Sequence, residues 1–242
     1  MKQNYYIGCS GWYYKDWTGK FYPEKGSKSK WLEYYSELFN TVEVNNTFYR
    51  FPNEKTVTGW YDKTPDDFKF TLKANQLITH RRRFKNTEST INRFYRLGDL
   101  LEDKLACILF QIPPNIKKEI DFLRNVLEQL DNSKNNVIEF RDPSWFDNEV
   151  YDLLNDYKVI FCSVSAPDLP EDLIVTSDIA YVRFHGKKDE KYRYLYSKRE
   201  LNEWAKKIEK SKVGEVFGYF NNDYNANAPK NAEMLKNYLN SI

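Results

Sequence analysis

Hydrophobic residues in this chain fall into short runs that recur along its length. The runs are five to seven residues long and rich in β-branched and aromatic side chains, which is typical of buried strands. Eight such runs are present, at residues 5–9, 41–45, 69–74, 106–112, 136–141, 159–164, 180–185 and 215–221. We therefore predict eight strands.

Segments whose apolar residues have helical spacing lie between most of these strands. Seven are present, at residues 30–39, 54–62, 87–102, 117–130, 144–155, 197–210 and 229–239. Ser197 and Glu200 form a capping-box pattern, and Asn53 is placed to cap the helix that follows it, because these side chains can bind the free N–H groups of a first turn. The interval after the sixth strand is too short for more than one helical turn.

The order of these elements predicts the fold class. Strict alternation of strand and helix favours a parallel sheet covered by helices. Eight repeats of that unit, in a chain of 242 residues, favour a closed (β/α)8 barrel of the TIM type over an open doubly wound sheet, which is the alternative. The lack of a Gly, Ser or Pro-rich linker predicts one domain over residues 1–242.

Polar side chains in the predicted strands share one parity. They alternate with apolar neighbours in three strands, as the pairs Glu43 and Asn45, Glu139 and Arg141, and Arg183 and His185. The same parity brings further polar residues to strand ends, namely Ser10, Lys73, Gln111, Ser163 and Asn221. In such barrels the C-terminal strand ends form the functional mouth, so we predict a polar site there. The competing interpretation is a closed polar network with a purely structural role.

Three of these residues are candidates for acid and base catalysis. Glu43 and Glu139 come from strands across the barrel and can flank a substrate, although each can instead neutralise a cation. His185 precedes Gly186, where the chain can turn sharply, and is the better acid or base. His80, in the loop after the third strand, is a second histidine near the mouth. Either histidine can instead serve only to orient its neighbours.

Cations at the same positions predict the class of ligand. Lys73, Arg141 and Arg183 can bind phosphate or carboxylate, since guanidinium groups offer paired donors that match these anions. The arginine run 81–83 can add to them, although an exposed charge run is usually only a solvated surface. We predict a small anionic, phosphate-containing ligand. These cations disfavour a divalent metal, so no metal ligand is assigned, and no cofactor motif is present.

Aromatic and amide side chains complete the predicted binding site. An aromatic segment at residues 12–22 includes Trp12 and can line a pocket for a sugar or base ring, or pack as core. Amides, a hydroxyl and an aromatic ring lie beside the predicted mouth, where they can contact a ligand. These are Asn45, Thr47, Tyr49, Asn221 and Asn222.

Composition narrows the range of partners. The formal net charge is only +2, so the whole molecule has no strong attraction for nucleic acid or an anionic membrane, and anion binding must be local. Three widely spaced cysteines indicate neither a disulfide framework nor a zinc site. The N-terminus lacks a long apolar core and no stretch is long enough to span a bilayer, so the sequence predicts a cytoplasmic protein without a membrane partner.

Six ordered motifs together carry a family resemblance. They are IGCSGW at 7–12, VEVNNTFY at 42–49, FQIPP at 110–114, EFRDPSW at 139–145, VRFHG at 182–186 and FNN at 220–222. The chain strongly resembles the YecE-like family of uncharacterised proteins over almost its whole length. The resemblance implies a (β/α)8 barrel with these motifs at its mouth, and it implies no reaction. Cys9 departs from a pattern that commonly has a small hydroxyl residue, so we assign no catalytic hydroxyl there.

Three functional hypotheses remain. The leading one is a hydrolase-like enzyme acting on an anionic phosphate- or sugar-containing ligand, with Glu43, Glu139 or His185 transferring protons. The second is non-catalytic binding of single-stranded or damaged nucleic acid, through the arginine run 81–83 and the aromatic segment near Trp12. The third is a structural or partner-binding role.

Overall fold

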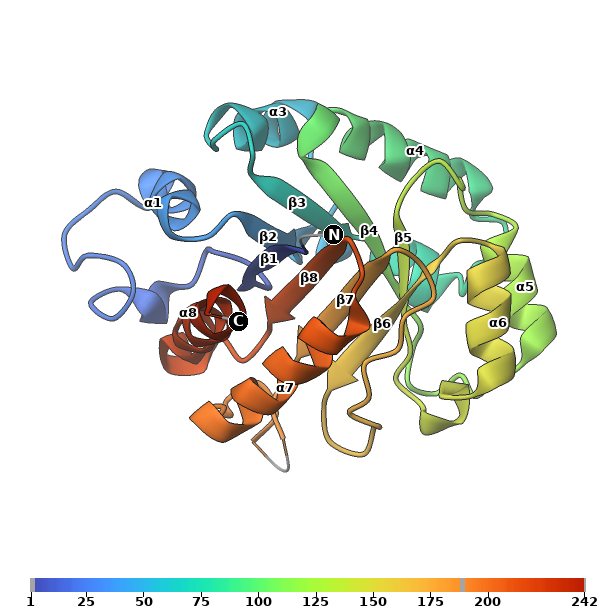
Figure 1. Cartoon of the computed structure of the whole chain (residues 1–242). Coiled ribbons are helices and arrows are strands. Elements are labelled where there is room, and N and C mark those ends of the chain that lie inside the picture. Colours follow the sequence, from blue (N-terminus) through green and yellow to red (C-terminus); the bar gives the residue numbers. More distant parts are fainter. Residues whose placement is uncertain (1–2, 188–189, 242) are drawn as a thin grey trace.

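Eight parallel strands close into a barrel in the computed structural model, which describes residues 3–187 and 190–241 (Figure 1). Each strand pairs with the next, and the last pairs with the first. The strands are β1 (Asn4–Cys9), β2 (Thr41–Val44), β3 (Lys69–Lys73), β4 (Leu105–Gln111), β5 (Asn136–Glu139), β6 (Ile160–Ser165), β7 (Ile179–Phe184) and β8 (Glu215–Phe220). The predicted (β/α)8 barrel is confirmed, and the open sheet is excluded because β1 and β8 pair.

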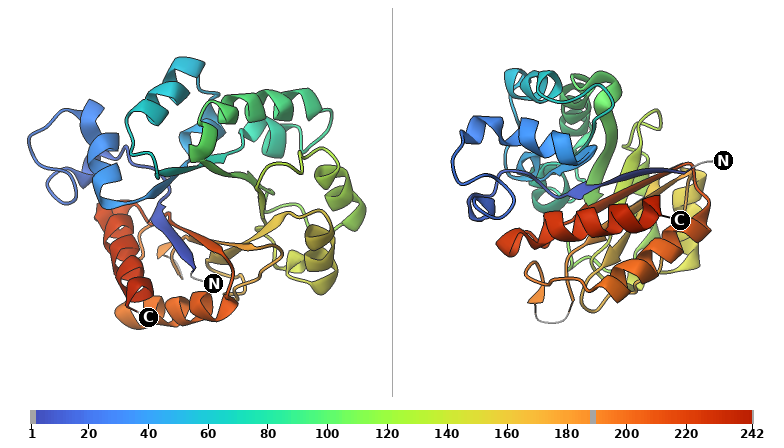
Figure 2. Two further views of the ribbon diagram at one scale, coloured as in Figure 1. Left: turned by 45° about the horizontal axis from the view of Figure 1, so that its top comes forward. Right: turned by 60° about the vertical axis from the view of Figure 1, so that its left-hand side comes forward.

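Helices surround the barrel on its outside, as the left view of Figure 2 shows. They are α1 (Trp31–Leu38), the short α2 (Asn46–Tyr49), α3 (Glu54–Asp62), α4 (Glu88–Asp99), α5 (Ile120–Leu127), α6 (Asn148–Asp156), α7 (Lys198–Ser211) and α8 (Asn227–Asn240). Both predicted caps are confirmed: Ser197 and Glu200 form a capping box on α7, and the Asn53 side chain accepts from the backbone N–H of Thr56.

Two predicted helices begin later than their patterns indicated: α5 begins at Ile120 instead of residue 117, and α6 differs more. Residues 144–155 have helical spacing, but α6 starts only at Asn148. Pro143 instead opens a separate 3₁₀ turn that the Asp142 side chain caps, and the Asp147 side chain then caps α6. Two consecutive N-capping carboxylates divide what the apolar spacing alone suggested was one helix.

The connection from β6 to β7 contains turns and irregular backbone over residues 166–178, as its length predicted. It also corrects one predicted orientation. Ser163 was expected to face the barrel interior, but its Oγ accepts from the backbone N–H of Ile174 in this connection. The neighbours Cys162 and Val164 pack instead with the interior cluster. The connection needs a partner for its own backbone, and that requirement places the serine outside.

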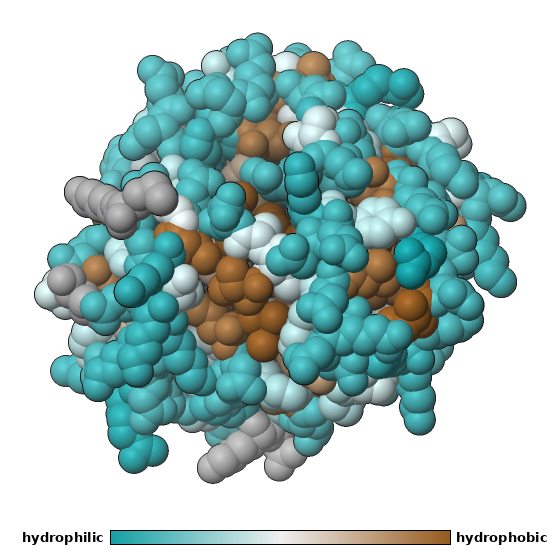
Figure 3. Space-filling view, turned by 45° about the vertical axis from the view of Figure 1, so that its right-hand side comes forward, coloured by the Kyte–Doolittle hydropathy of each residue, from teal (hydrophilic) through white to brown (hydrophobic). Residues whose placement is uncertain are grey.

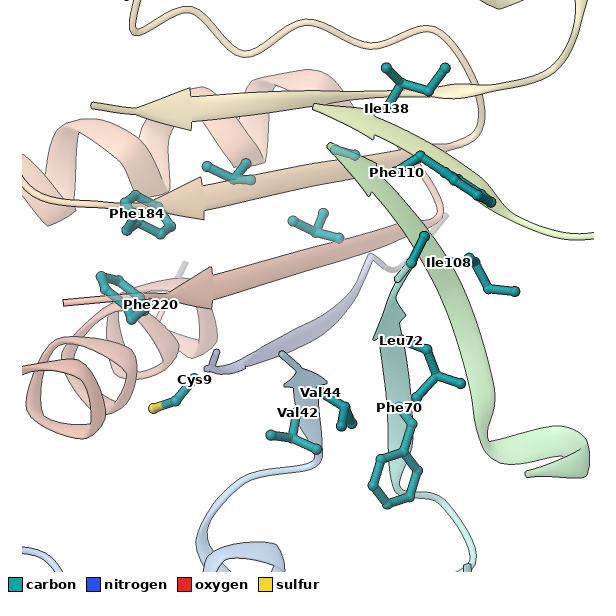
Figure 4. Packing of buried hydrophobic residues seen from close by; sticks show 14 of the residues in the cluster. Cys9, Val42, Val44, Phe70, Leu72, Ile108, Phe110, Ile138, Phe184 and Phe220 are labelled. Atoms are coloured by element: carbon teal, nitrogen blue, oxygen red, sulfur yellow. The ribbon is translucent and has the colours of Figure 1, made fainter. Parts of the chain in front are cut away.

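The hydrophobic core has an outer and an inner part. Outward-facing residues of the strands, among them Val42, Leu72 and Phe110, pack beneath the helices (Figure 4). A smaller cluster fills the barrel interior, with Leu109, Val137 and the rings of Phe217 and Tyr219 among its members. The Tyr219 hydroxyl bonds to Thr41 Oγ1 at 2.7 Å inside the barrel. The polar residues of the candidate site lie toward the C-terminal strand ends.

Hydrophilic side chains dominate the face that Figure 3 presents, with apolar atoms gathered in a central patch. In the described part of the chain, no helix combines the length and apolar character that a membrane crossing requires.

Candidate functional site

A charged layer crosses the barrel interior above the apolar core. Arg183, from β7, is fully buried and lies between two buried carboxylates, Glu43 of β2 and Glu139 of β5. Its Nη2 donates to Glu43 Oε1 and its Nη1 to Glu139 Oε2, each at 2.6 Å. Parallel strands bring these three residues to one height, and one guanidinium therefore links opposite sides of the barrel.

Further donors and acceptors surround this layer. The Tyr181 hydroxyl donates to Glu43 Oε2 at 2.6 Å. His185 Nε2 lies 2.9 Å from Glu139 Oε1, and His185 Nδ1 lies 3.1 Å from Asn221 Nδ2. The carboxylate at Nε2 and the amide N–H at Nδ1 fit a neutral imidazole with its proton on Nε2, whereas Arg141 Nη2, which lies 3.1 Å from the same Nε2 and can only donate, fits the other tautomer.

The layer controls the ionisation of its members. Burial opposes the charge on Glu139, but Arg141 and Arg183 outweigh it and hold the pKa of that carboxyl well below its usual range. Burial, and then the charges of Arg141 and Arg183, lower the pKa of His185 well below its ordinary value. Glu139 is thus an ion-paired carboxylate and His185 a neutral ring, as the charge-neutralising and orienting interpretations proposed.

We expect Glu139→Gln to lower the free energy of unfolding by about 3 kcal/mol. The amide cannot carry the charge that faces Arg183 and Arg141, and its NH2 group adds a donor where donors already converge. Urea denaturation followed by circular dichroism measures the change. Glu203→Gln is the matched control, because Glu203 is 61% exposed and its loss should change stability by less than about 0.5 kcal/mol. Equal denaturation midpoints for the two variants would contradict the expectation.

A pocket of about 480 Å³ opens at the C-terminal strand ends, directly beside this layer. We call it the mouth pocket, and it is lined by Tyr14, Asn45, Phe48, Tyr49, Lys73, Gln111, Arg141, Tyr192, Asn221 and Asp223. Two cations, three amides, one carboxyl and four aromatic rings therefore face one space. Arg141 and Asn221 belong to both the mouth pocket and the network around His185.

Lys73 differs from the other buried cations of the site. Its Nζ donates to Gln111 Oε1 at 2.7 Å and lies 4.5 Å from the centre of the Phe48 ring. The ion pairs formed among the described residues include Arg141 and Arg183 but none for Lys73. Burial, and then the charge of Arg183, lower the pKa of Lys73 to about 7, against the opposing effect of Glu139 and Glu43. Among the described residues, no carboxylate therefore pairs directly with this ammonium.

The structure brings six of the predicted site residues to the mouth pocket. These are Asn45, Tyr49, Lys73, Gln111, Arg141 and Asn221. The three predicted catalytic residues, Glu43, Glu139 and His185, have no exposed surface and lie with Arg183 below the pocket. Their catalytic role stays a prediction. Glu139 and His185 contact Arg141 and Asn221 and so position them, whereas Glu43 contacts Arg183 and Tyr181.

Five other predicted ligand-binding residues lie outside the pocket lining. Thr47 Oγ1 is within 2.8 Å of the carbonyl oxygens of Val44 and Lys73, and Asn222 Nδ2 donates to Tyr194 O and Asn231 Oδ1. The Trp12 ring packs edge-on against Trp60, and His80 Nδ1 lies 2.7 Å from Thr79 Oγ1. Ser10 is buried, and its Oγ has no hydrogen-bond partner among the described residues. Thr47 and Asn222 thus hold the loops of the mouth in place.

Four residues of the mouth pocket were not among the predicted binders. Tyr14 belongs to the aromatic segment 12–22, Phe48 stands between Thr47 and Tyr49, and Asp223 directly follows Asn222. Each was therefore next to a residue that the sequence did single out. Tyr192 comes from the loop after β7, where nothing in the pattern indicated a binding residue.

The arginine run at residues 81–83 is exposed to solvent, and the Arg82 guanidinium donates from Nη1 to the carbonyl oxygen of Asn86 at 3.1 Å. The run lies outside the set of residues that line the mouth pocket. Among the residues that the structure describes, no group of three or more His, Cys, Asp or Glu side chains is placed to hold a metal ion. The cations that line the mouth pocket are instead Lys73 and Arg141.

Comparisons with known proteins agree on one family. The family model described as "Protein of unknown function DUF72" matches residues 6–241. The UPF0759 protein YunF of Bacillus subtilis is 30% identical over 97% of this chain and 94% of its own length. The UPF0759 protein YecE of Escherichia coli is 29% identical over 58% of this chain and half of its own.

Solved structures extend this result. A DUF72 family protein from Thermotoga maritima is 32% identical and superposes with a TM-score of 0.90, over 98% of this chain and all of its own. A DUF72 family protein from Enterococcus faecalis, 21% identical with a TM-score of 0.84 over 98% of this chain and 95% of its own, shares the fold. The resemblance to YecE-like proteins is confirmed, and this chain belongs to the DUF72 family of proteins of unknown function.

Proposed function

We propose that this protein is a hydrolase-like enzyme that binds a small anionic, phosphate- or sugar-containing substrate in the mouth pocket. The observation that carries the proposal is the buried ammonium of Lys73, which faces the pocket and forms no ion pair with any described residue. A buried charge is costly unless it is paired, so a substrate anion can supply its counter-charge.

The rest of the lining supports the same ligand class. Arg141 offers guanidinium donors beside Lys73, and guanidinium geometry matches phosphate and carboxylate oxygens. Asn45, Gln111 and Asn221 supply amides that both donate and accept, which suits sugar hydroxyls. The rings of Tyr14, Phe48, Tyr49 and Tyr192 supply flat apolar surfaces for a sugar or other ring.

The layer below the pocket supports the proposal by fixing the binding residues. Arg141 Nε lies 2.7 Å from Glu139 Oε1, and Asn221 Nδ2 lies 3.1 Å from His185 Nδ1. Both pocket side chains are therefore held from beneath. Fixed donors lose little freedom when a ligand binds. The three cysteines are free and buried, which fits a reducing compartment, and we propose the cytoplasm as the location.

Purified protein tests the proposal with a panel of phosphomonoesters, phosphodiesters and glycosides, and with inorganic phosphate as a competitor. We expect turnover of at least one phosphorylated or glycosidic compound, and inhibition of that turnover by phosphate. A triple variant that replaces each arginine of the run 81–83 by glutamine is the control and should keep both properties. Binding of a single-stranded oligonucleotide that depends on that run, without turnover of any compound, would overturn the proposal in favour of nucleic-acid binding.

A further inference from the structure

The loop after β8 places a carboxylic acid in the lining of the mouth pocket, together with the cations Lys73 and Arg141. Among the described residues that line the pocket, Asp223 is the one carboxylic acid. Its backbone is fixed, because the buried Trp17 side chain donates from Nε1 to Asp223 O at 2.7 Å. The half-buried Asp223 side chain forms no ion pair with any described residue. A half-buried carboxyl that shares a pocket with Lys73 and Arg141, on a fixed backbone and without an ion pair to any described residue, requires a chemical explanation.

We infer that Asp223 is the general acid of the mouth pocket, which faces a bound phosphomonoester in its protonated form and protonates the leaving oxygen. This inference rests on the proposed function and narrows its substrate class to phosphomonoesters. An ionised Asp223 would repel the substrate, whereas a protonated one donates a hydrogen bond to it. Substrate binding therefore favours the form of Asp223 that the reaction needs.

The surroundings of Asp223 favour that protonated form. Burial raises the pKa of Asp223 to about 6, and Asp16 adds to the effect, while a bond from its own backbone N–H opposes it. Tyr14 and Asp16 come from the loop after β1, and Lys73 and Arg141 line the same pocket. Tyr192 and Arg193 come from the loop after β7, where the Arg193 guanidinium lies 5.0 Å from the centre of the Tyr224 ring. A general acid works best with a pKa near the working pH.

The proposed step is hydrolysis of one phosphate ester bond. A water oxygen forms a bond to phosphorus while the bond from phosphorus to the ester oxygen breaks. The ester oxygen keeps the electron pair of that bond and takes the proton of Asp223, so the alcohol leaves neutral. The proton lost by the attacking water passes to the phosphate product or to solvent, and solvent returns a proton to Asp223. Lys73 and Arg141 bind the phosphate oxygens throughout.

Sulfate binding tests the inference without requiring turnover, because sulfate keeps its charge between pH 5 and 8. We expect Asp223→Asn to bind sulfate about fivefold more tightly than the wild type at pH 8 and equally well at pH 5, measured by calorimetry. Asp16→Asn is the matched control, because Asp16 is exposed and outside the pocket lining, and it should shift the profile far less. The same pH profile in wild type and Asp223→Asn would overturn the inference.

Leaving-group dependence tests the proton transfer itself. Asp223→Asn is expected to lower kcat by about a hundredfold or more for an alkyl phosphate, with KM little changed. The loss should be much smaller for p-nitrophenyl phosphate, whose leaving oxygen needs no proton. Equal losses for both esters would overturn the general-acid role. If sulfate fails to bind the wild type at every pH, the proposed function fails together with this inference; if it binds with an unaltered profile in the variant, only the inference fails.

Discussion

Arg183→Met is expected to lower the free energy of unfolding by at least about 3–5 kcal/mol. The substitution keeps an unbranched apolar stem but removes the charge that Glu43 and Glu139 share. All three residues have no exposed surface, so water cannot replace the lost partner. Because a domain is stable by only about 5–15 kcal/mol, the variant should be close to unfolding at room temperature. Urea denaturation, with soluble yield as a second readout, measures the effect.

Two further variants test this expectation. Arg199→Met removes an arginine that is 87% exposed and paired with Glu203, and it should change stability by less than about 0.5 kcal/mol. A triple variant that adds Glu43→Gln and Glu139→Gln to Arg183→Met should recover part of the lost stability, because the two carboxylates that Arg183 neutralised are then uncharged as well; the loss of the Glu139 partner of Arg141 keeps the recovery incomplete. An Arg183→Met protein as stable as the wild type would show that the charged layer contributes nothing to folding.

The barrel itself was predictable because its physical causes are local. Strands buried on two faces need continuous runs of β-branched and aromatic residues, and the helices that cover them need one apolar stripe. Parity within strands also identified correctly that Glu43, Glu139 and Arg183 share the interior. The cost of burying a charge forces such residues to face one another.

In β6 the alternation of polar and apolar residues did not predict which side chains face the barrel interior. Ser163 and Ser165 alternate with Cys162 and Val164, so either face was compatible with a barrel interior. The irregular connection 166–178 settles the choice, because the backbone N–H of Ile174 needs an acceptor and Ser163 Oγ supplies it. Serine is small enough to stand under a loop where a helix covers the other strands. The hydrogen-bond acceptor that the following connection requires therefore decides the orientation of Ser163.

The position of each site residue along the barrel axis was the second property that the sequence did not predict. Alternation places Glu139 and Arg141 on one face, yet Arg141 lines the mouth pocket while Glu139 lies buried beneath it. Although they are only two positions apart along the chain, Arg141 can contact a ligand in the pocket, whereas Glu139 positions Arg141 from below. Tyr192 and Asp223 were also beyond reach, since their loops have no periodic pattern and reach the pocket only through the closed fold.

The buried lysines Lys73 and Lys104 have different surroundings, which indicate a binding role for Lys73 and a structural role for Lys104. Lys104 Nζ donates to the carbonyl oxygens of Tyr61 and Thr64, each at 2.8 Å, and lies 4.2 Å from the centre of the Tyr61 ring. Lys104 thereby stabilises the turn between α3 and β3. Lys73 Nζ has one acceptor among the described residues, Gln111 Oε1, and it faces an open pocket. Removal of the Lys104 ammonium should therefore lower the free energy of unfolding, whereas removal of the Lys73 ammonium should not.

Lys73→Met is expected to weaken sulfate binding at pH 7 by about a hundredfold while leaving the fold as stable as the wild type or more stable. Methionine fills a similar volume and removes an ammonium that forms no ion pair with any described residue. In the wild type the folded Lys73 loses its proton near pH 7, whereas an unfolded lysine keeps it to about pH 10.4. The unfolded state then binds more protons, so wild-type stability should rise by up to about 1.4 kcal/mol per pH unit between about pH 7 and 8.5. Lys73→Met should lack that rise.

Lys104→Met is the matched control for this result. It leaves two carbonyl oxygens without their donor and should lower the free energy of unfolding by about 2–3 kcal/mol, with sulfate affinity unchanged. Calorimetry with sulfate and urea denaturation between pH 7 and 8.5 measure both properties in both variants. A Lys73→Met protein that loses stability as Lys104→Met does, while still binding sulfate normally, would make Lys73 a structural residue and remove the observation on which the proposed function rests.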